Sequence, residues 1–332
     1  MPPAAGRIDV HAHAVPPVFR TALAAELPPG KARSPAWTPE LALEGMDGNG
    51  ITSALLSLST PGTHLGDDGR ARLLSRHCNE YFAELRDRPG KRFGAFAAVP
   101  LPDVEGACRE AEHALDILKL DGIGVFSNYD GKHLGDAEFD PLLERLNERA
   151  AVVFIHPTHN CLCEAVHPNV PPTLVEYPFD TTRAAINLIV SGAMDRFPRI
   201  RFILAHAGGT LPYLAWRISR TLARHFSLSL FPDRYPQEWR ERNAANVTPD
   251  FTMSRLRRFW YDTALAPGPE VFGSLLTVAN RERILFGTDT PYAADFMIKE
   301  GIEILGATDF LDAPLRAAIA RSNALQLFPR LG

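Results

Sequence analysis

The sequence predicts an α/β barrel built from eight strand–helix units. Apolar runs alternate with segments of helical spacing along 332 residues. Several runs, such as AVVFI and RFILA, are continuously apolar, which is typical of parallel strands buried on both faces. Four runs end in a histidine or an aspartate, and functional sites form at the carboxyl ends of barrel strands. We therefore expect a (β/α)8 TIM barrel, a single domain over residues 1–332, with long loops over its C-terminal face.

Eight segments account for the expected strands, and helical segments fall between them. Residues 138–149 carry a helix start signal, with Asp140 as the N-cap and Pro141 at the first helical position. Residues 103–119 form another expected helix, and residues 181–197 a third, because its apolar side chains follow helical spacing. In chain order the expected strands cover residues 7–12, 52–58, 92–98, 121–126, 151–156, 200–206, 258–262 and 283–288.

Three connections are too long for simple turns. Residues 14–37 follow the first strand and are rich in proline, and residues 157–180 follow the fifth strand. Both leave the carboxyl face of the barrel, so we expect them to cover the site. Residues 226–250 are aromatic and charged and follow the sixth helix, where they could instead serve subunit contact.

Composition argues against two classes of partner. The formal net charge is -4 and no basic block occurs, so nucleic acid is not expected to bind. No apolar run approaches the length of about 20 residues that a membrane-spanning helix needs. The N-terminus lacks a charged start followed by an apolar segment, so we expect no signal peptide and a cytoplasmic location. The four cysteines form no pair of C-x-x-C motifs, which favours reduced thiols.

The first expected strand ends in the sequence IDVHAH, which places His11 and His13 two residues apart. Side chains two residues apart on a strand point to the same side, so both imidazoles face one point. Neutral imidazole is a good ligand for zinc and similar ions. Taken alone, the pair is equally consistent with two buried histidines that bind each other or the backbone.

Three further ligand types end other expected strands. His156 lies in VVFIHP, His206 in FILAHAGG and Asp289 in ILFGTDTP. A buried carboxylate such as Asp289 needs a partner because burying a bare charge is costly, and a metal ion supplies one. Each of these residues alone is more often structural. Their joint occurrence at the ends of the first, fifth, sixth and eighth strands predicts a metalloenzyme.

This set of an H-x-H pair, two more strand-end histidines and a strand-end aspartate resembles the amidohydrolase superfamily. The chain is similar to its aminocarboxymuconate semialdehyde decarboxylase branch over nearly its whole length. The segments FSNYDGKHLGD, FIHPTHN, EYPFDTTRAAINLIVSG and LAHAGGTLPYL look most like 6-methylsalicylate and related salicylate-type decarboxylases. The fourth strand, GIGVFSNYD, ends without a lysine, so a two-metal site with a carbamylated lysine is not expected.

The resemblance implies a role for each strand-end residue. His11, His13, His156 and Asp289 would hold one divalent metal ion. Zinc is the expected ion and manganese the alternative, since imidazoles with a carboxylate suit several divalent ions. His206 would lie close by as a catalytic acid/base, and Asp289 would share that role.

Three other residues are candidates for substrate binding. Arg217 follows His206 at the offset where the family has an arginine that reaches a neighbouring subunit's site and grips the substrate carboxylate. A guanidinium binds a carboxylate through two parallel hydrogen bonds, which lysine cannot mimic. Arg183, expected in the first turn of a helix near the barrel mouth, and His159, in the loop after the fifth strand, are the others. Each could equally be an ordinary surface residue.

Two reactions fit these parts. The resemblance implies a carboxy-lyase, a homodimer that decarboxylates a hydroxylated aromatic carboxylic acid without an organic cofactor. The alternative is hydrolysis of a small lactone or amide, since the same metal can lower the pKa of a bound water. A non-catalytic scaffold is a third hypothesis, disfavoured because every expected ligand is present. A carboxylate-gripping arginine together with aromatic walls would favour decarboxylation.

Overall fold

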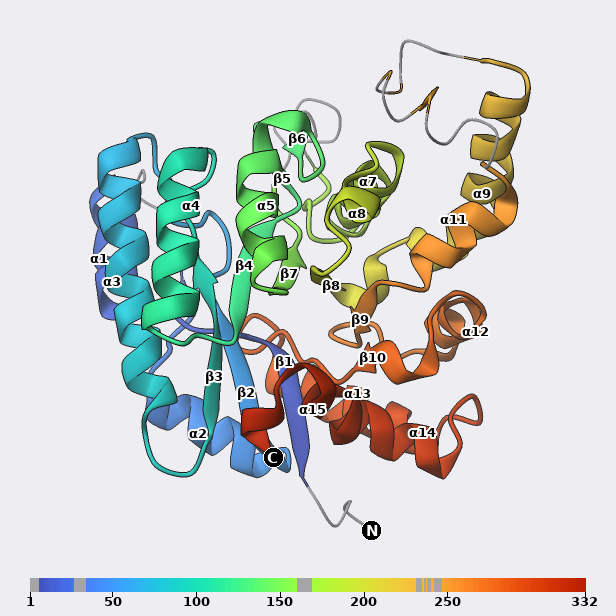
Figure 1. Ribbon diagram of the computed structural model, residues 1–332. Helices are drawn as coiled ribbons and strands as arrows, with labels where there is room; N and C mark the ends of the chain where they lie inside the picture. The colour runs from blue at the N-terminus through green and yellow to red at the C-terminus, as the bar shows by residue number, and fades with distance from the viewer. Residues whose placement is uncertain are drawn as a thin grey trace.

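The computed structural model describes residues 6–26, 34–159, 169–230, 235, 237, 240–241 and 247–332. Eight strands pair in parallel in chain order and build one sheet (Figure 1). They are β1 Arg7–His13, β2 Ile51–Ser57, β3 Phe93–Ala98, β4 Gly122–Phe126, β7 Val152–His156, β8 Arg201–Leu204, β9 Trp260–Asp262 and β10 Ile284–Leu285. Each overlaps one of the predicted segments, and the predicted fold class is confirmed.

The barrel closes between β10 and β1 through an irregular seam rather than a regular ladder. The amide of Val10 donates to the carbonyl of Phe286 at 2.9 Å, and the amide of His13 donates to the carbonyl of Thr290 at 2.7 Å. The amide of Asp289 returns a hydrogen bond to the carbonyl of His11 at 2.8 Å. β10 is therefore shorter than predicted, because the chain beyond Leu285 leaves the ladder to bring Asp289 beside β1.

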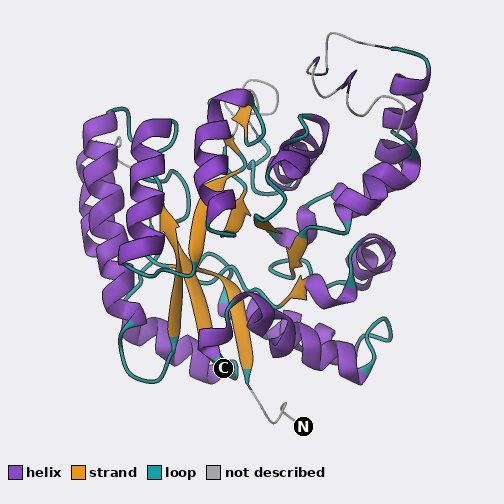
Figure 2. Cartoon of the chain, viewed as in Figure 1, coloured by secondary structure: helices purple, strands orange, loops and turns teal. Residues whose placement is uncertain are grey.

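Helices form the layer outside the sheet (Figure 2). Thr38, Asp67, Asp103, Thr248 and Asp312 each accept a hydrogen bond from an amide in the first turn of a helix, which satisfies a donor that has no partner within the helix. In the described part of the chain, no helix is both long and apolar enough to cross a membrane. The α-helices are α1 Pro17–Glu26, α2 Pro39–Gly48, α3 Asp68–Arg86, α4 Val104–Glu112, α5 Asp140–Glu148, α7 Glu176–Val190, α8 Ala193–Arg196, α9 Leu211–Ser227, α11 Pro249–Leu256, α12 Pro269–Val278, α13 Asp295–Ala307, α14 Ala313–Ala317 and α15 Asn323–Leu327.

Two details of the predicted helices are wrong. Asp140 is the first residue of α5 rather than its N-cap, because a 3-10 turn over Ala137–Phe139 leads directly into the helix. Its carboxylate instead accepts hydrogen bonds from the guanidinium of Arg196. The helix expected over residues 181–197 is two helices, since Gly192 has a φ of 77° and separates α7 from α8.

The long predicted connections are partly helical. Residues 14–37 contain α1, and α7 begins at Glu176, inside the connection expected over residues 157–180. Part of that connection, including Cys161 and Cys163, lies outside the described residues. So does much of the connection at 226–250. Cys78 and Cys108 are free thiols.

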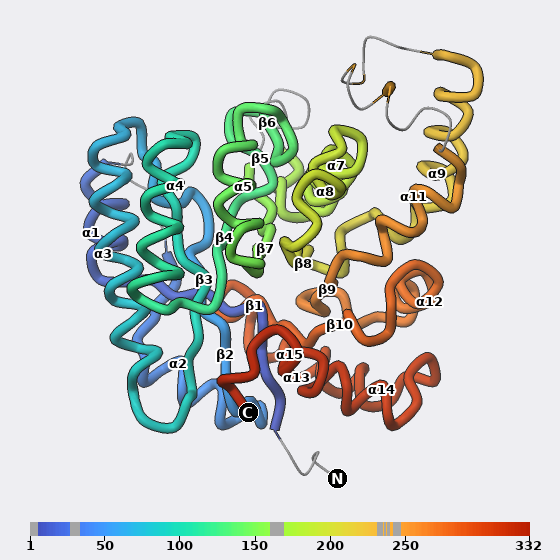
Figure 3. Tube along the Cα trace, in the orientation of Figure 1, coloured from blue at the N-terminus to red at the C-terminus, as the bar shows by residue number. Residues whose placement is uncertain are grey.

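The interior of the barrel is apolar at the end that holds the two termini (Figure 3). Phe96 and Phe154 stack with ring centroids 5.1 Å apart, and Phe328 packs edge-on against Phe96. Ala324, Leu327 and Leu331 belong to the same buried cluster. The C-terminal segment therefore plugs one end of the barrel, and the carboxyl ends of the strands point to the other.

Candidate metal centre

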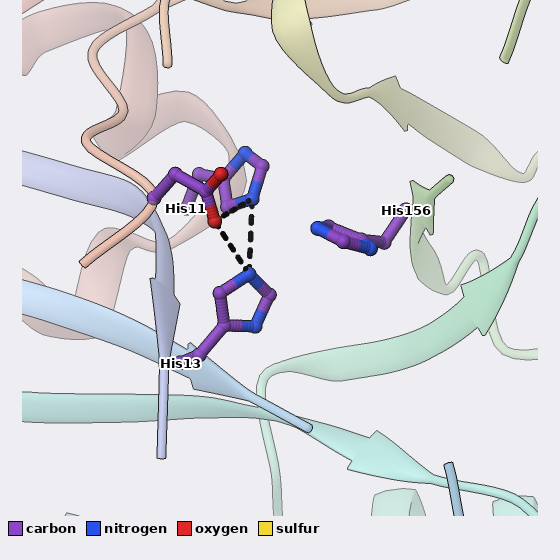
Figure 4. A group of neighbouring side chains, drawn as sticks. His11, His13 and His156 are labelled. Atoms are coloured by element: carbon purple, nitrogen blue, oxygen red, sulfur yellow. Dashed lines mark hydrogen bonds and ion pairs between the residues drawn. The ribbon is translucent and has the colours of Figure 1, made fainter. Parts of the chain in front are cut away.

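Four buried side chains meet at the carboxyl ends of the strands. His11 and His13 end β1, His156 ends β7, and Asp289 follows β10. One ligand atom from each lies within 4.8 Å of the others. In Figure 4 the rings of His11, His13 and His156 face a common centre. The structure thus brings together the four residues that the sequence predicts as metal ligands.

The atoms nearest the centre are two imidazole nitrogens and a carboxylate oxygen. Nε2 of His11 lies 3.1 Å from Nε2 of His13. Oδ1 of Asp289 lies 3.3 Å from the first nitrogen and 3.0 Å from the second. Nε2 of His156 is buried and has no hydrogen-bond partner within the part of the chain that the structure describes. An orphaned buried nitrogen beside three other donor atoms fits a divalent ion, which takes imidazole and carboxylate ligands.

The opposite nitrogen of each imidazole is held by a partner. Nδ1 of His156 donates to the carbonyl of Pro157 at 2.7 Å, and Nδ1 of His11 donates to Oδ2 of Asp262 at 2.7 Å. Nδ1 of His13 lies 3.0 Å from Oγ of Ser57. Because a carbonyl and a carboxylate only accept, His156 and His11 each carry a proton on Nδ1, and Nε2 is the ring atom that faces the centre. Such outer contacts orient metal-binding histidines.

The charges of the site also suit a cation. Burial, reinforced by the imidazoles of His13 and His11, holds the pKa of His156 well below its usual range, so this ring is neutral. Burial would raise the pKa of Asp289, but the nearby histidines outweigh it and hold that pKa well below the usual range. Burial also opposes a charge on His11, yet Asp262 and Asp289 raise its pKa to about 10. A divalent ion beside Nε2 would replace that proton and satisfy the same carboxylates.

A buried aspartate fixes the turn that carries Asp289. Oδ1 of Asp9 accepts from the amides of His11 and Thr288, at 3.0 and 3.1 Å, and Oδ2 accepts from the hydroxyl of Thr288 at 2.6 Å. Burial raises the pKa of Asp9 to about 7. Asp289 has a φ of 65°, a left-handed conformation that is uncommon for a residue with a side chain. Asp9 therefore ties β1 to the strained turn that carries Asp289.

His206 lies next to the four candidate ligands. It follows β8 with a φ of 55°, and its amide donates to Oδ1 of Asp262 at 2.8 Å. Its Nε2 lies 3.3 Å from Oδ2 of Asp289. The ring centroid is 4.9 Å from that of His11. His206 and Asp289 are therefore placed to exchange a proton, while Oδ1 of Asp289 faces the other histidines.

Comparison with known proteins identifies the family. A family model of amidohydrolases matches residues 8–330. The chain belongs to the amidohydrolase family. Its similarity to 6-methylsalicylic acid decarboxylase of Penicillium expansum is 35% identity over 331 residues, covering 98% of this chain and 97% of that protein. The family predicted from the strand-end residues is confirmed.

Solved structures share the fold of this amidohydrolase. An amidohydrolase II structure superposes with a TM-score of 0.85 at 26% identity, over 97% of this chain and 99% of the other. 5-Carboxyvanillate decarboxylase of Novosphingobium aromaticivorans, in complex with manganese and 4-hydroxy-3-methoxy-5-nitrobenzoic acid, superposes with a TM-score of 0.82 at 20% identity. That pair covers 98% of this chain and 96% of the other.

The predicted substrate-binding residues of this amidohydrolase lie on α7, on α9 and after β7. Arg183 is exposed in the third turn of α7, not in its first turn, because the helix begins at Glu176. Arg217 is exposed on α9, beside Tyr213 and Trp216, which are 80% and 69% exposed. His159 is half-buried after β7. None of the three is part of the four-residue cluster.

Two sequence motifs meet above the barrel mouth. Asp180, from EYPFDTTR in α7, accepts hydrogen bonds from the hydroxyl of Ser127 and, at 2.6 Å, from the side-chain Nδ2 of Asn128. Nε2 of His133 lies 3.4 Å from the same carboxylate. Ser127, Asn128 and His133 belong to FSNYDGKHLGD, which forms the hairpin of β5 Asn128–Tyr129 and β6 Lys132–His133. The motifs therefore anchor the hairpin to α7.

Proposed function

We propose that this protein is a metal-dependent carboxy-lyase that removes carbon dioxide from a hydroxylated aromatic acid of the salicylate type. The observation that carries the proposal is the buried Nε2 of His156, which has no hydrogen-bond partner among the described residues and lies among the donor atoms of His11, His13 and Asp289. The relative from Penicillium expansum, similar over 98% of this chain, supports the reaction class. It also makes 6-methylsalicylate the first substrate to test.

The proposed metal is a single divalent ion held by His11, His13, His156 and Asp289. Three imidazoles and one carboxylate form a donor set that suits zinc, and manganese is the alternative because a structural relative binds it. When bound, the ion supplies Lewis acidity that orients the phenol and carboxylate groups of the substrate and withdraws negative charge from them.

Residues of the chain move the proton. Decarboxylation breaks the bond between the ring carbon and the carboxylate, and the ring carbon must gain a proton in exchange for carbon dioxide. The pair of His206 and Asp289, with Nε2 and Oδ2 3.3 Å apart, is the proposed donor. Protonation of the ring carbon interrupts aromaticity, and loss of carbon dioxide restores it. The burial of Asp289 limits water at this step.

The substrate carboxylate needs a cation from elsewhere. Among the described residues, no arginine or lysine forms a hydrogen bond or ion pair with the four candidate ligands or with His206. We propose that Arg217 of a second copy supplies this charge in a homodimer. Tyr213 and Trp216, large aromatic side chains exposed on the same helix, support a subunit contact at this face. Arg183 and His159 are the secondary candidates for substrate contact.

The test is a substrate panel on protein of known metal content. Salicylates are offered in parallel with simple aryl lactones and amides, and carbon dioxide and ring products are followed. Carbon dioxide with the matching phenol is the expected result. Cleaved lactone or amide without carbon dioxide would assign the hydrolytic reaction instead, with His206 or Asp289 as the base that activates water.

A further inference from the structure

A small cavity opens beside the candidate metal ligands on one side of the barrel. Its volume is about 20 Å³. Ser57, which contacts His13, and His156 belong to its wall, so the cavity adjoins the centre. Its other walls come mainly from β3, β4 and β7. We name it the substituent cavity and define it by Ser57, Ala98, Gly124, Phe126, Phe154 and His156.

We propose that the substituent cavity receives the ring methyl group of the substrate and thereby selects a methyl-substituted salicylate over a hydroxyl-substituted one. The inference rests on the proposed function, because the substrate must be anchored at the metal centre for its ring substituent to reach the cavity. The cavity is placed for this, since a group next to the anchored carboxylate or phenol lies nearest to the metal ligands.

The size of the cavity limits the substituent. A cavity needs about 10–15 Å³ to hold one water-sized group. The space of about 20 Å³ therefore holds one methyl group. A longer or branched substituent would overpack the surrounding strands, which are rigid because interior side chains are close-packed.

The wall offers little to a hydroxyl group. The hydroxyl of Ser57 contacts His13, and that of Thr63 lies 2.7 Å from the hydroxyl of Ser75. The hydroxyl of Tyr129 accepts a hydrogen bond from the amide of Phe126 at 2.9 Å, which leaves its own proton as the wall's available donor. The described residues that line the cavity include no aspartate, glutamate, lysine or arginine. A ring hydroxyl would lose its hydrogen bonds to water and find few hydrogen-bond partners in the cavity. A methyl group makes no hydrogen bonds to water and so loses none.

Gly124 creates much of the room. A Cβ built on this residue would meet Cβ of Phe96 at 3.4 Å and Cβ of Ser57 at 3.8 Å, which are ordinary contact distances. Both neighbours line the cavity. Another part of the wall is the ring of Phe126, which packs so closely on Gly62 that a Cβ there would lie 2.4 Å from the ring. An alanine at position 124 therefore fills the space of one methyl group without displacing the walls.

The experiment compares wild-type metal-loaded protein with Gly124→Ala. Binding is measured by calorimetry with three nitro compounds that cannot lose carbon dioxide, 2-nitrophenol, 3-methyl-2-nitrophenol and 2-nitroresorcinol. They match salicylate, 6-methylsalicylate and 2,6-dihydroxybenzoate, whose carbon dioxide release is followed separately. Gly301→Ala is the matched control. Gly301 lies on α13, outside the cavity, and a Cβ on it would also find its nearest neighbour at 3.4 Å.

In wild-type protein we expect the methyl compound to bind at least about tenfold more tightly than the other two, as a filled apolar pocket predicts. Gly124→Ala should lose that preference and keep its affinity for 2-nitrophenol, and Gly301→Ala should behave as wild type. An unchanged methyl preference in Gly124→Ala, or no preference in wild type, would overturn the cavity assignment. Selective binding with no carbon dioxide from any acid would leave the cavity assignment standing and overturn the decarboxylase. Absence of binding by all three compounds would overturn both.

Discussion

The two sides of the barrel mouth are built in opposite ways. On the side of β1, β8, β9 and β10, polar side chains are buried and partnered: Asp9 holds the turn before Asp289, and Asp262 holds both His11 and the backbone of His206. On the side of β2, β3 and β4, small residues such as Gly124 leave apolar space. His156 lies at the boundary and belongs to both. The difference suggests that one side performs the reaction and the other selects the substrate.

The largest effect is expected from His13→Ala, a substitution on the polar side of the barrel mouth. His13 is fully buried, and its loss removes one of four donors, so metal and activity should disappear together for every substrate. Metal content by elemental analysis and carbon dioxide release are the measurements. His77→Ala, on the exposed face of α3, is the control. Stoichiometric metal in His13→Ala would remove this residue from the ligand set.

His206→Gln should separate the proton step from metal binding. His206 is not one of the four candidate ligands, and its Nε2 contacts Oδ2 of Asp289. We therefore expect the metal to remain and kcat to fall by about 10²–10⁴, the usual contribution of a general acid or base. The loss should be equal for salicylate and 6-methylsalicylate, since the polar side does not contact the ring substituent. A kcat close to that of the wild type would exclude His206 from the reaction.

Arg217→Ala tests whether the mouth is completed by a second copy. A lost charge-assisted hydrogen bond should weaken substrate binding by about 1.5–3 kcal/mol and raise KM accordingly. Mixed dimers of Arg217→Ala with His206→Gln should regain activity if the arginine acts across the interface, because one of the two sites is then intact. Unchanged KM and kcat would exclude Arg217 from substrate binding. Arg183→Ala would then be tested in the same way.

Asp262→Asn should weaken metal binding without abolishing it, because Asp262 fixes the orientation of His11. The amides of His206 and Ala264 would keep the Asn oxygen on their side, at the place of Oδ1. The Asn NH2 group would then face Nδ1 of His11 and force its proton onto Nε2, which lies at the metal centre. We expect metal affinity to fall about 10–100-fold, as for other outer contacts of metal-binding histidines. A competitive chelator titration measures it, and wild-type affinity would contradict the tautomer assignment.

Sequence alone was sufficient to place the strands and to predict that the four candidate ligands lie together, because a residue at the end of an apolar run must lie at the mouth of a parallel barrel. It was not sufficient for contacts that depend on the fold. The hydrogen bond between His11 and Asp262 joins residues 251 positions apart, and nothing in either segment specifies the pair.

Other features depend on local geometry that periodicity does not encode. Helical spacing continues across Gly192, yet its left-handed backbone ends α7 there. Arg183 was predicted in the first turn of its helix but lies in a later turn, because α7 begins at Glu176, within a segment whose sequence predicts a loop. The substituent cavity depends on the volume left by Gly124 between Phe96 and Ser57, which only packing reveals.

The most direct test of metal-dependent decarboxylation is to remove the metal with a chelator and restore it stepwise. Carbon dioxide release from 6-methylsalicylate is then followed against the number of metal ions bound per chain. We expect no turnover in the stripped protein and a linear recovery that ends at one ion per chain, because the described residues contain one such four-residue group. Turnover by the metal-free protein, or recovery that continues to a second ion, would contradict it.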